Sequence, residues 1–180
     1  MASRSVYLAT YRGSASQRAH FAIFIPNAAD DSRDLSVDFR SDSTKGTVIH
    51  VVGEPVMNGY TLEFKRNYEC KDSRDLQKLV RLGTVDAANL YDPPSTKFVK
   101  ESTPRGTLER EAAKVAPPRG GQNVRAPIDG VTTKRCQEWT MEYLKLLADQ
   151  GLIDASAVST AEAERDPPNH GIFGAKKAAN

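Results

Sequence analysis

Three residues of this sequence have types and positions suited to acyl-transfer chemistry: His20, His50 and Cys136. A cysteine thiol can attack a carbonyl carbon, and a neighbouring imidazole can remove the thiol proton as a general base. The chain has only three histidines and two cysteines, so each can be followed individually. The first hypothesis is therefore a cysteine-dependent hydrolase or acyltransferase.

The cysteine falls in the strongest predicted helix, which covers residues 132–150. Its apolar residues recur every three or four positions and share one face: Cys136, Trp139, Tyr143, Leu146 and Leu147. Cys136 comes about one turn into this helix, where unpaired backbone N–H groups favour an anion. We expect this position to lower the pKa of the thiol. The same N–H groups could hold a developing oxyanion.

The two histidines fall in an early set of predicted strands. Strands are predicted over residues 5–11, 20–26, 47–52, 60–69 and 76–85, and helices over 107–115, 132–150 and 155–165. Strands followed by helices predict an α+β fold, with helices layered over an antiparallel meander of about five strands. Alternate residues of a strand face one side. His20 and His50 can therefore both lie under the Cys136 helix if their strands are neighbours in matching register.

The length predicts a single domain over residues 1–165. Residues 27–46 are rich in Asp, Ser and Arg, which is typical of a mobile loop inserted between strands. Residues 117–130 form a predicted Pro- and Gly-rich connector, and residues 166–180 a flexible tail.

The net charge of +2, with no dominant run of Lys or Arg, argues against nucleic-acid binding. No apolar run is long enough to cross a bilayer, and the first ten residues lack the pattern of a signal peptide. A cytoplasmic protein with two free thiols, no cofactor and no metal is expected. Its expected partner is a small-molecule, peptidyl or acyl substrate, and a protein partner stays open.

Two short motifs carry a resemblance to a known superfamily. The strand His20-Phe-Ala-Ile-Phe-Ile resembles the His-Trp-Ala-Ile-Tyr-Val strand of lecithin:retinol acyltransferase-like proteins, and the strand ending in His50 is similar to their second histidine strand. Arg135-Cys136-Gln-Glu-Trp resembles their Asn-Cys-Glu-His-Phe motif. These proteins form the circularly permuted branch of the NlpC/P60 papain-like superfamily, in which the histidine precedes the cysteine, as here. Small fungal proteins with His-x-Ala-Ile-Phe-Ile-Pro and Arg-Cys-Gln-Glu-Trp motifs are similar over the whole chain.

The resemblance covers roughly residues 5–150 and implies a permuted papain-like fold. It implies that Cys136 is the nucleophile, His20 the general base and His50 the third polar residue, acting on amides, esters or thioesters. Phe21 and Arg135 depart from the Trp and Asn of those motifs. No hydrophobic anchor follows the cysteine helix, which argues against a phospholipid substrate.

Two other functions stay open. Cys136 could be a small core residue and the histidines structural groups, in an inactive binding module that contacts a partner through residues 27–46 and the connector. A metal ion held by Cys136, His20 and His50 is a third alternative, although the sequence has no close ligand pair.

Three further residues have side chains capable of chemistry. Tyr11 ends the first strand and could donate a hydrogen bond to a bound intermediate, although a plain strand aromatic is the simpler interpretation. Cys70 is predicted to be structural, and His170 to be solvated in the tail.

Overall fold

The computed structural model describes residues 2–172 of the 180-residue chain. It contains one open antiparallel sheet with the strand order β5-β1-β2-β3-β4-β6. The strands are β1 (Ser3–Tyr11), β2 (His20–Pro26), β3 (Lys45–Glu54), β4 (Gly59–Glu69), β5 (Leu76–Asp86) and β6 (Val99–Glu101). The helices are α1 (Thr107–Ala112), α2 (Cys136–Asp149) and α3 (Ser156–Glu162), with short 3-10 turns at Ala28–Asp30 and Ala87–Asn89.

The predicted α+β class and the sheet-then-helix order are confirmed. The predicted five-stranded meander is wrong in two respects. Strand β5 crosses the sheet to pair with β1 instead of extending the meander beside β4, and the short strand β6 takes that edge. The short connection 70–75 between β4 and β5 gives no sequence signal that β5 pairs with β1 instead of β4.

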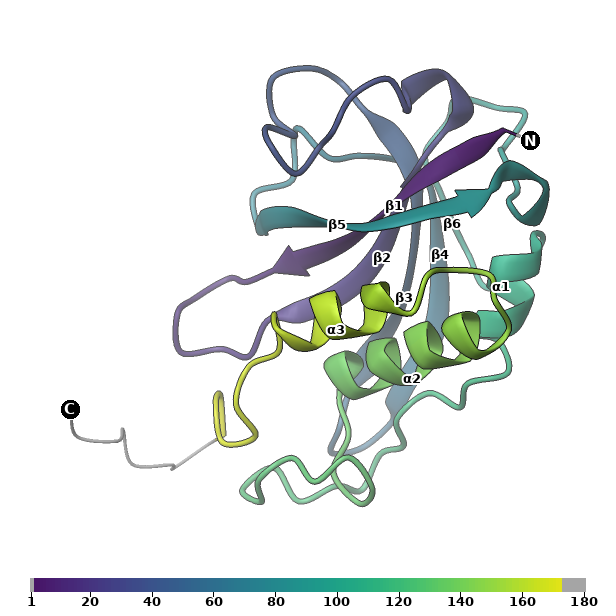
Figure 1. The fold of residues 1–180 in the computed structure, drawn as a ribbon. Coiled ribbons are helices and arrows are strands. Elements are labelled where there is room, and N and C mark those ends of the chain that lie inside the picture. Colours follow the sequence, from purple (N-terminus) through teal and green to yellow (C-terminus); the bar gives the residue numbers. More distant parts are fainter. Residues whose placement is uncertain (1, 173–180) are drawn as a thin grey trace.

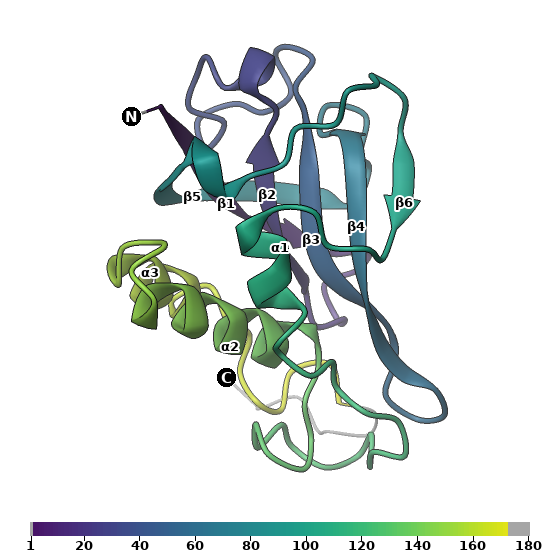
Figure 2. The same ribbon diagram turned by 90° about the vertical axis from the view of Figure 1, so that its right-hand side faces the viewer.

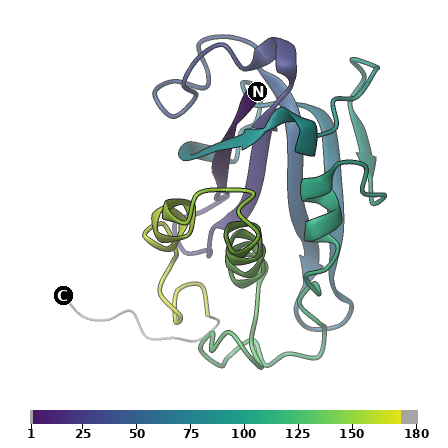
Figure 3. The same ribbon diagram turned by 45° about the vertical axis from the view of Figure 1, so that its right-hand side comes forward.

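All three helices contribute to the core on one face of the sheet, and α2 lies against β2 and β3 (Figures 1 and 3). The apolar stripe of α2 supplies that core: Trp139 stacks on Tyr143 with ring centroids 5.4 Å apart. The polar atoms of both rings are bonded, since the indole N–H donates to Val115 O and the Tyr143 hydroxyl to Leu108 O. Trp and Tyr side chains can be buried in this way because their N–H and O–H groups have hydrogen-bond partners.

The opposite face of the sheet is covered by the segment 27–46. Leu35 is fully buried and Phe39 nearly so, and both pack with Tyr7, Phe24 and other residues of that face. The Leu35 N–H also donates to the Tyr7 hydroxyl. The prediction of a mobile surface loop is therefore wrong, because two apolar side chains are enough to pack this polar segment onto the sheet.

The β3–β4 hairpin extends beyond the sheet and pairs with the connector (Figure 2). Tyr60 N–H donates to Pro118 O over 2.8 Å, and Gly121 N–H to Val56 O over 2.7 Å. Gly59 has φ +71°, and a Cβ there would lie 2.5 Å from the backbone nitrogen of Gly120. Only glycine fits this approach. The connector is thus fixed against the hairpin tip.

Within residues 2–172, no helix combines the length and apolar character needed to cross a membrane.

Candidate active site

The two histidines form a hydrogen-bonded chain with a glutamate. His20 Nε2 lies 2.8 Å from His50 Nδ1, and His50 Nε2 lies 3.0 Å from Glu63 Oε1. The sheet positions them: Ile23 pairs with Ile49, so His50 lies diagonal to His20 on the same face, and His50 pairs with Glu63 in β4.

The Glu63 carboxylate decides which atoms donate and which accept in these two hydrogen bonds. A carboxylate oxygen accepts, so His50 Nε2–H donates to Glu63 and His50 Nδ1 is left to accept from His20 Nε2–H. His20 Nδ1 then carries a lone pair, and no hydrogen bond within residues 2–172 occupies it. That nitrogen can take up a proton.

Both imidazoles are neutral near pH 7. Burial lowers the pKa of His20 to about 4, helped by the charge of Lys65. Burial, together with the neighbouring His20 and Lys65, lowers the pKa of His50 to about 2. His20 is therefore unprotonated at rest, which is the form that a general base requires.

The structure places Cys136 at the first residue of α2. The helix begins later than predicted because the Asp129 carboxylate accepts hydrogen bonds from the N–H groups of Val131, Thr132 and Thr133, which closes a turn. Cys136 Sγ lies 3.9 Å from the carbonyl oxygen of Ala19.

The expected lowering of the thiol pKa is wrong. Cys136 is only 8% exposed, and burial raises its pKa to about 11. Hydrogen bonds from the N–H groups of Phe21 and Gln137 act in the opposite direction but are outweighed. Loss of solvation dominates over the helix terminus here. The resting thiol is protonated.

The expectation that both imidazoles lie on the face covered by the Cys136 helix is also wrong. Phe21 belongs to the core under α2, as do Ile23 and Ile25, so His20 faces the other way. The His20 ring lies 5.8 Å from that of its cross-strand neighbour Tyr11. The Cys136 thiol contacts the backbone on either side of His20. Its Sγ lies near the carbonyl oxygen of Ala19 and accepts a hydrogen bond from the N–H of Phe21. No hydrogen bond joins the thiol to either imidazole.

Cys136 and His20 both line one cleft of about 330 Å³. The hairpin contributes Pro55 and Tyr60, the connector Val124 and Ile128, and the C-terminal segment His170 and Ile172. A pocket of this size, with a thiol and an imidazole at its wall, is suited to a small ligand.

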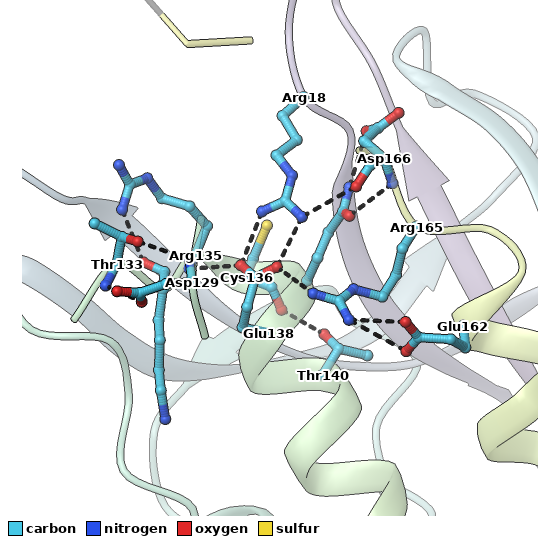
Figure 4. Close-up of polar contacts among 12 residues, drawn as sticks. Arg18, Asp129, Thr133, Arg135, Cys136, Glu138, Thr140, Glu162, Arg165 and Asp166 are labelled. Atoms are coloured by element: carbon cyan, nitrogen blue, oxygen red, sulfur yellow. Dashed lines mark hydrogen bonds and ion pairs between the residues drawn. The ribbon is translucent and has the colours of Figure 1, made fainter. Parts of the chain in front are cut away.

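The segment after α3 holds the start of β2 against α2. The Asp166 carboxylate accepts from Ala19 N–H over 2.7 Å and from Gln137 Nε2 over 2.9 Å, and Gln137 Nε2 also donates to Ala19 O. Figure 4 shows Asp166 beside the ion pairs of Glu138 with Arg18 and Arg165.

The predicted flexible tail is therefore wrong for residues 166–172, because hydrogen bonds fix them to the sheet and helix. Residues 173–180 lie outside the described part of the chain.

The other residues singled out from the sequence lie in different places. Tyr11 packs beside His20 and is not among the residues that line the cleft, and its buried hydroxyl has no hydrogen-bond partner within residues 2–172. Cys70 is fully buried among the apolar residues on the face of the sheet that segment 27–46 covers, and burial raises its pKa far above the usual range. His170, predicted to be solvated, lies at the cleft with Nε2 3.1 Å from Gln17 O. Both cysteines are free thiols, as predicted.

Glu63 is a functional candidate that the sequence alone did not single out. Its signal was present, because the alternation of its strand puts it on the polar face. The sequence does not show the register of β3 against β4, and it is this register that pairs Glu63 with His50. Within residues 2–172, no three Cys, His, Asp or Glu side chains converge as metal ligands, so the Cys136–His20–His50 metal site is not formed.

The family of unknown function DUF6540 matches residues 6–154. The chain belongs to this family. The DUF6540 match includes His20, His50, Glu63 and Cys136, whereas Asp166 lies beyond it. No curated protein and no solved structure matches the chain.

Proposed function

We propose that this DUF6540 protein is a cysteine-dependent hydrolase or acyltransferase that acts on amides, esters or thioesters through an acyl-Cys136 intermediate. The observation that carries the proposal is the Glu63–His50–His20 chain, which ends at the cleft containing the Cys136 thiol. The motif resemblance suggests that the antiparallel sheet and α2 are those of a permuted papain-like fold.

The resting pair is a neutral thiol and a neutral imidazole, so proton transfer accompanies attack. Sγ forms a bond to the substrate carbonyl carbon while His20 Nδ1 takes the thiol proton, directly or through one water. The resulting imidazolium is stabilised by His50 and Glu63. The backbone N–H of Cys136, at the start of α2, faces the developing oxyanion.

Attack on the carbonyl gives a tetrahedral intermediate. When it collapses to acyl-Cys136, the leaving group departs and takes the proton from His20. Water, or an amine or alcohol in a transferase, then attacks the thioester and gives its proton to His20. The acid, amide or ester product leaves, and the thiol recovers its proton from His20.

The test is the rate of alkylation by iodoacetamide at pH 7.5, mapped to each cysteine by mass spectrometry. Cys136 should react, Cys70 should not react in the folded protein, and His20→Gln should slow Cys136 by at least about tenfold, at the low end of what a general base contributes. His170→Gln is the matched control, since its imidazole lines the same cleft. Equal Cys136 rates in the wild type and His20→Gln would refute the proposal.

A second candidate is a binding module without catalysis, which the buried thiol with its pKa near 11 favours. In that case Cys136 would react slowly in the wild type and independently of His20. The same alkylation experiment separates the two functions.

A further inference from the structure

The charges that line the cleft point to the substrate class. The charged residues at its wall are Arg18 and Arg135, and among the described residues no Asp or Glu lines it. The other lining side chains, such as Val124 and Ile128, are largely apolar. A site of this composition favours a ligand with a hydrocarbon part and a negative charge.

The two arginines differ in how far their charge is neutralised. Both Nη groups of Arg18 donate to the Glu138 carboxylate, at 2.8 and 2.7 Å, so the ends of this guanidinium are occupied by an ion pair, which Glu138 shares with Arg165. Arg135 donates through Nη1 to Gln122 Oε1 and Lys134 O, and both of these acceptors are uncharged.

Within residues 2–172, Arg135 has no carboxylate partner, and its Nε and Nη2 groups have no acceptor. Lys134 beside it is paired with Glu142. Arg135 is therefore the cation of the cleft that remains available to a ligand, and its neighbour in sequence is the nucleophile Cys136.

We propose that the substrate carries a carboxylate on its acyl part, and that Arg135 is the residue that selects it. This inference rests on the proposed function, since it assigns the substrate of the same site. A guanidinium presents paired N–H donors that match a carboxylate, which a lysine does not. The cleft volume of about 330 Å³ holds on the order of ten non-hydrogen atoms, the size of a short dicarboxylic acid monoester or an N-acyl amino acid.

The probes are iodoacetate and iodoacetamide, which have nearly the same shape and differ in charge. The measured quantity is the ratio of their alkylation rates at Cys136, compared with the same ratio at N-acetylcysteine amide. We expect the ratio at Cys136 to be about five- to tenfold higher, the size expected for one partly hydrated guanidinium–carboxylate contact.

Arg135→Gln should remove this preference, and Arg135→Lys should keep part of it. Arg125→Gln is the matched control, because Arg125 lies in the connector beside Val124 but is not among the residues that line the cleft. In the unsubstituted protein, raising the salt concentration to about 1 M should reduce the preference, which tests the charge without any substitution.

A ratio at Cys136 equal to that of the free thiol, or one unchanged by salt and by Arg135→Gln, would overturn the inference. These outcomes are separate from failure of the proposed function, which appears as an iodoacetamide rate that does not depend on His20.

Discussion

Acidification from about pH 7 to about pH 5 should destabilise the folded protein through its two buried histidines. In the folded chain the pKa of His20 is about 4 and that of His50 about 2, because burial disfavours the charged form. In the unfolded chain both titrate near a pKa of about 6.5. Because the folded pKa values are depressed, the stability they provide is present above about pH 6.5 and is lost as the pH falls.

The magnitude follows from proton linkage. Between about pH 7 and pH 5 the unfolded chain takes up about 0.7 of a proton at each histidine, and the folded chain takes up almost none. Integration over this window gives about 2 kcal/mol for each histidine and about 4 kcal/mol for the pair. The buried carboxyl groups of Glu138 and Asp166, whose pKa values are lowered by their ion pairs and hydrogen bonds against the effect of burial, titrate below this window.

Urea denaturation at a series of pH values measures this directly. The free energy of unfolding should fall by about 4 kcal/mol in the wild type and by about half as much in His50→Gln. A wild-type free energy that changes by less than about 1 kcal/mol over the window would refute the assignment of two buried neutral histidines.

Three further predictions concern the surroundings of the site. Glu63→Gln should slow alkylation of Cys136 by iodoacetamide about tenfold, since the charge that supports the imidazolium is lost; an unchanged rate contradicts this. Asp166→Ala should slow the same reaction and lower the free energy of unfolding in urea by about 1–3 kcal/mol, because buried groups lose their hydrogen-bond acceptor. Leu35→Ala should lower it by about 2–4 kcal/mol, and a cost under about 1 kcal/mol would mean that segment 27–46 does not pack as described.

The sequence predicts the elements of this fold well because their patterns are local. The apolar stripe from Cys136 to Leu147 and the β-branched run around His50 need no tertiary context. The face of the sheet that the helices cover is not local. β2 is apolar on both sides, with Phe21 and Ile23 on one face and Phe24 on the other, so its alternation cannot show which face packs on α2.

The environment of the thiol could not be predicted from the sequence for a similar reason. The Asp129 turn moves the helix start to Cys136, and the hydrogen bonds of Asp166 close the C-terminal segment over it. The sulfur is buried in this setting, and burial is the largest influence on its pKa. The sequence pattern showed the helix terminus but not the side chains that exclude water from it.

The most direct test of the central claim is a stopped-flow measurement of p-nitrophenol release from the mono-p-nitrophenyl ester of glutaric acid. We predict a burst of about one product per chain, with the acyl group found on Cys136 by mass spectrometry and the burst at least about tenfold slower in His20→Gln. No burst, or a burst of equal rate in His20→Gln, would contradict the claim that Cys136 and His20 form a nucleophile and its base.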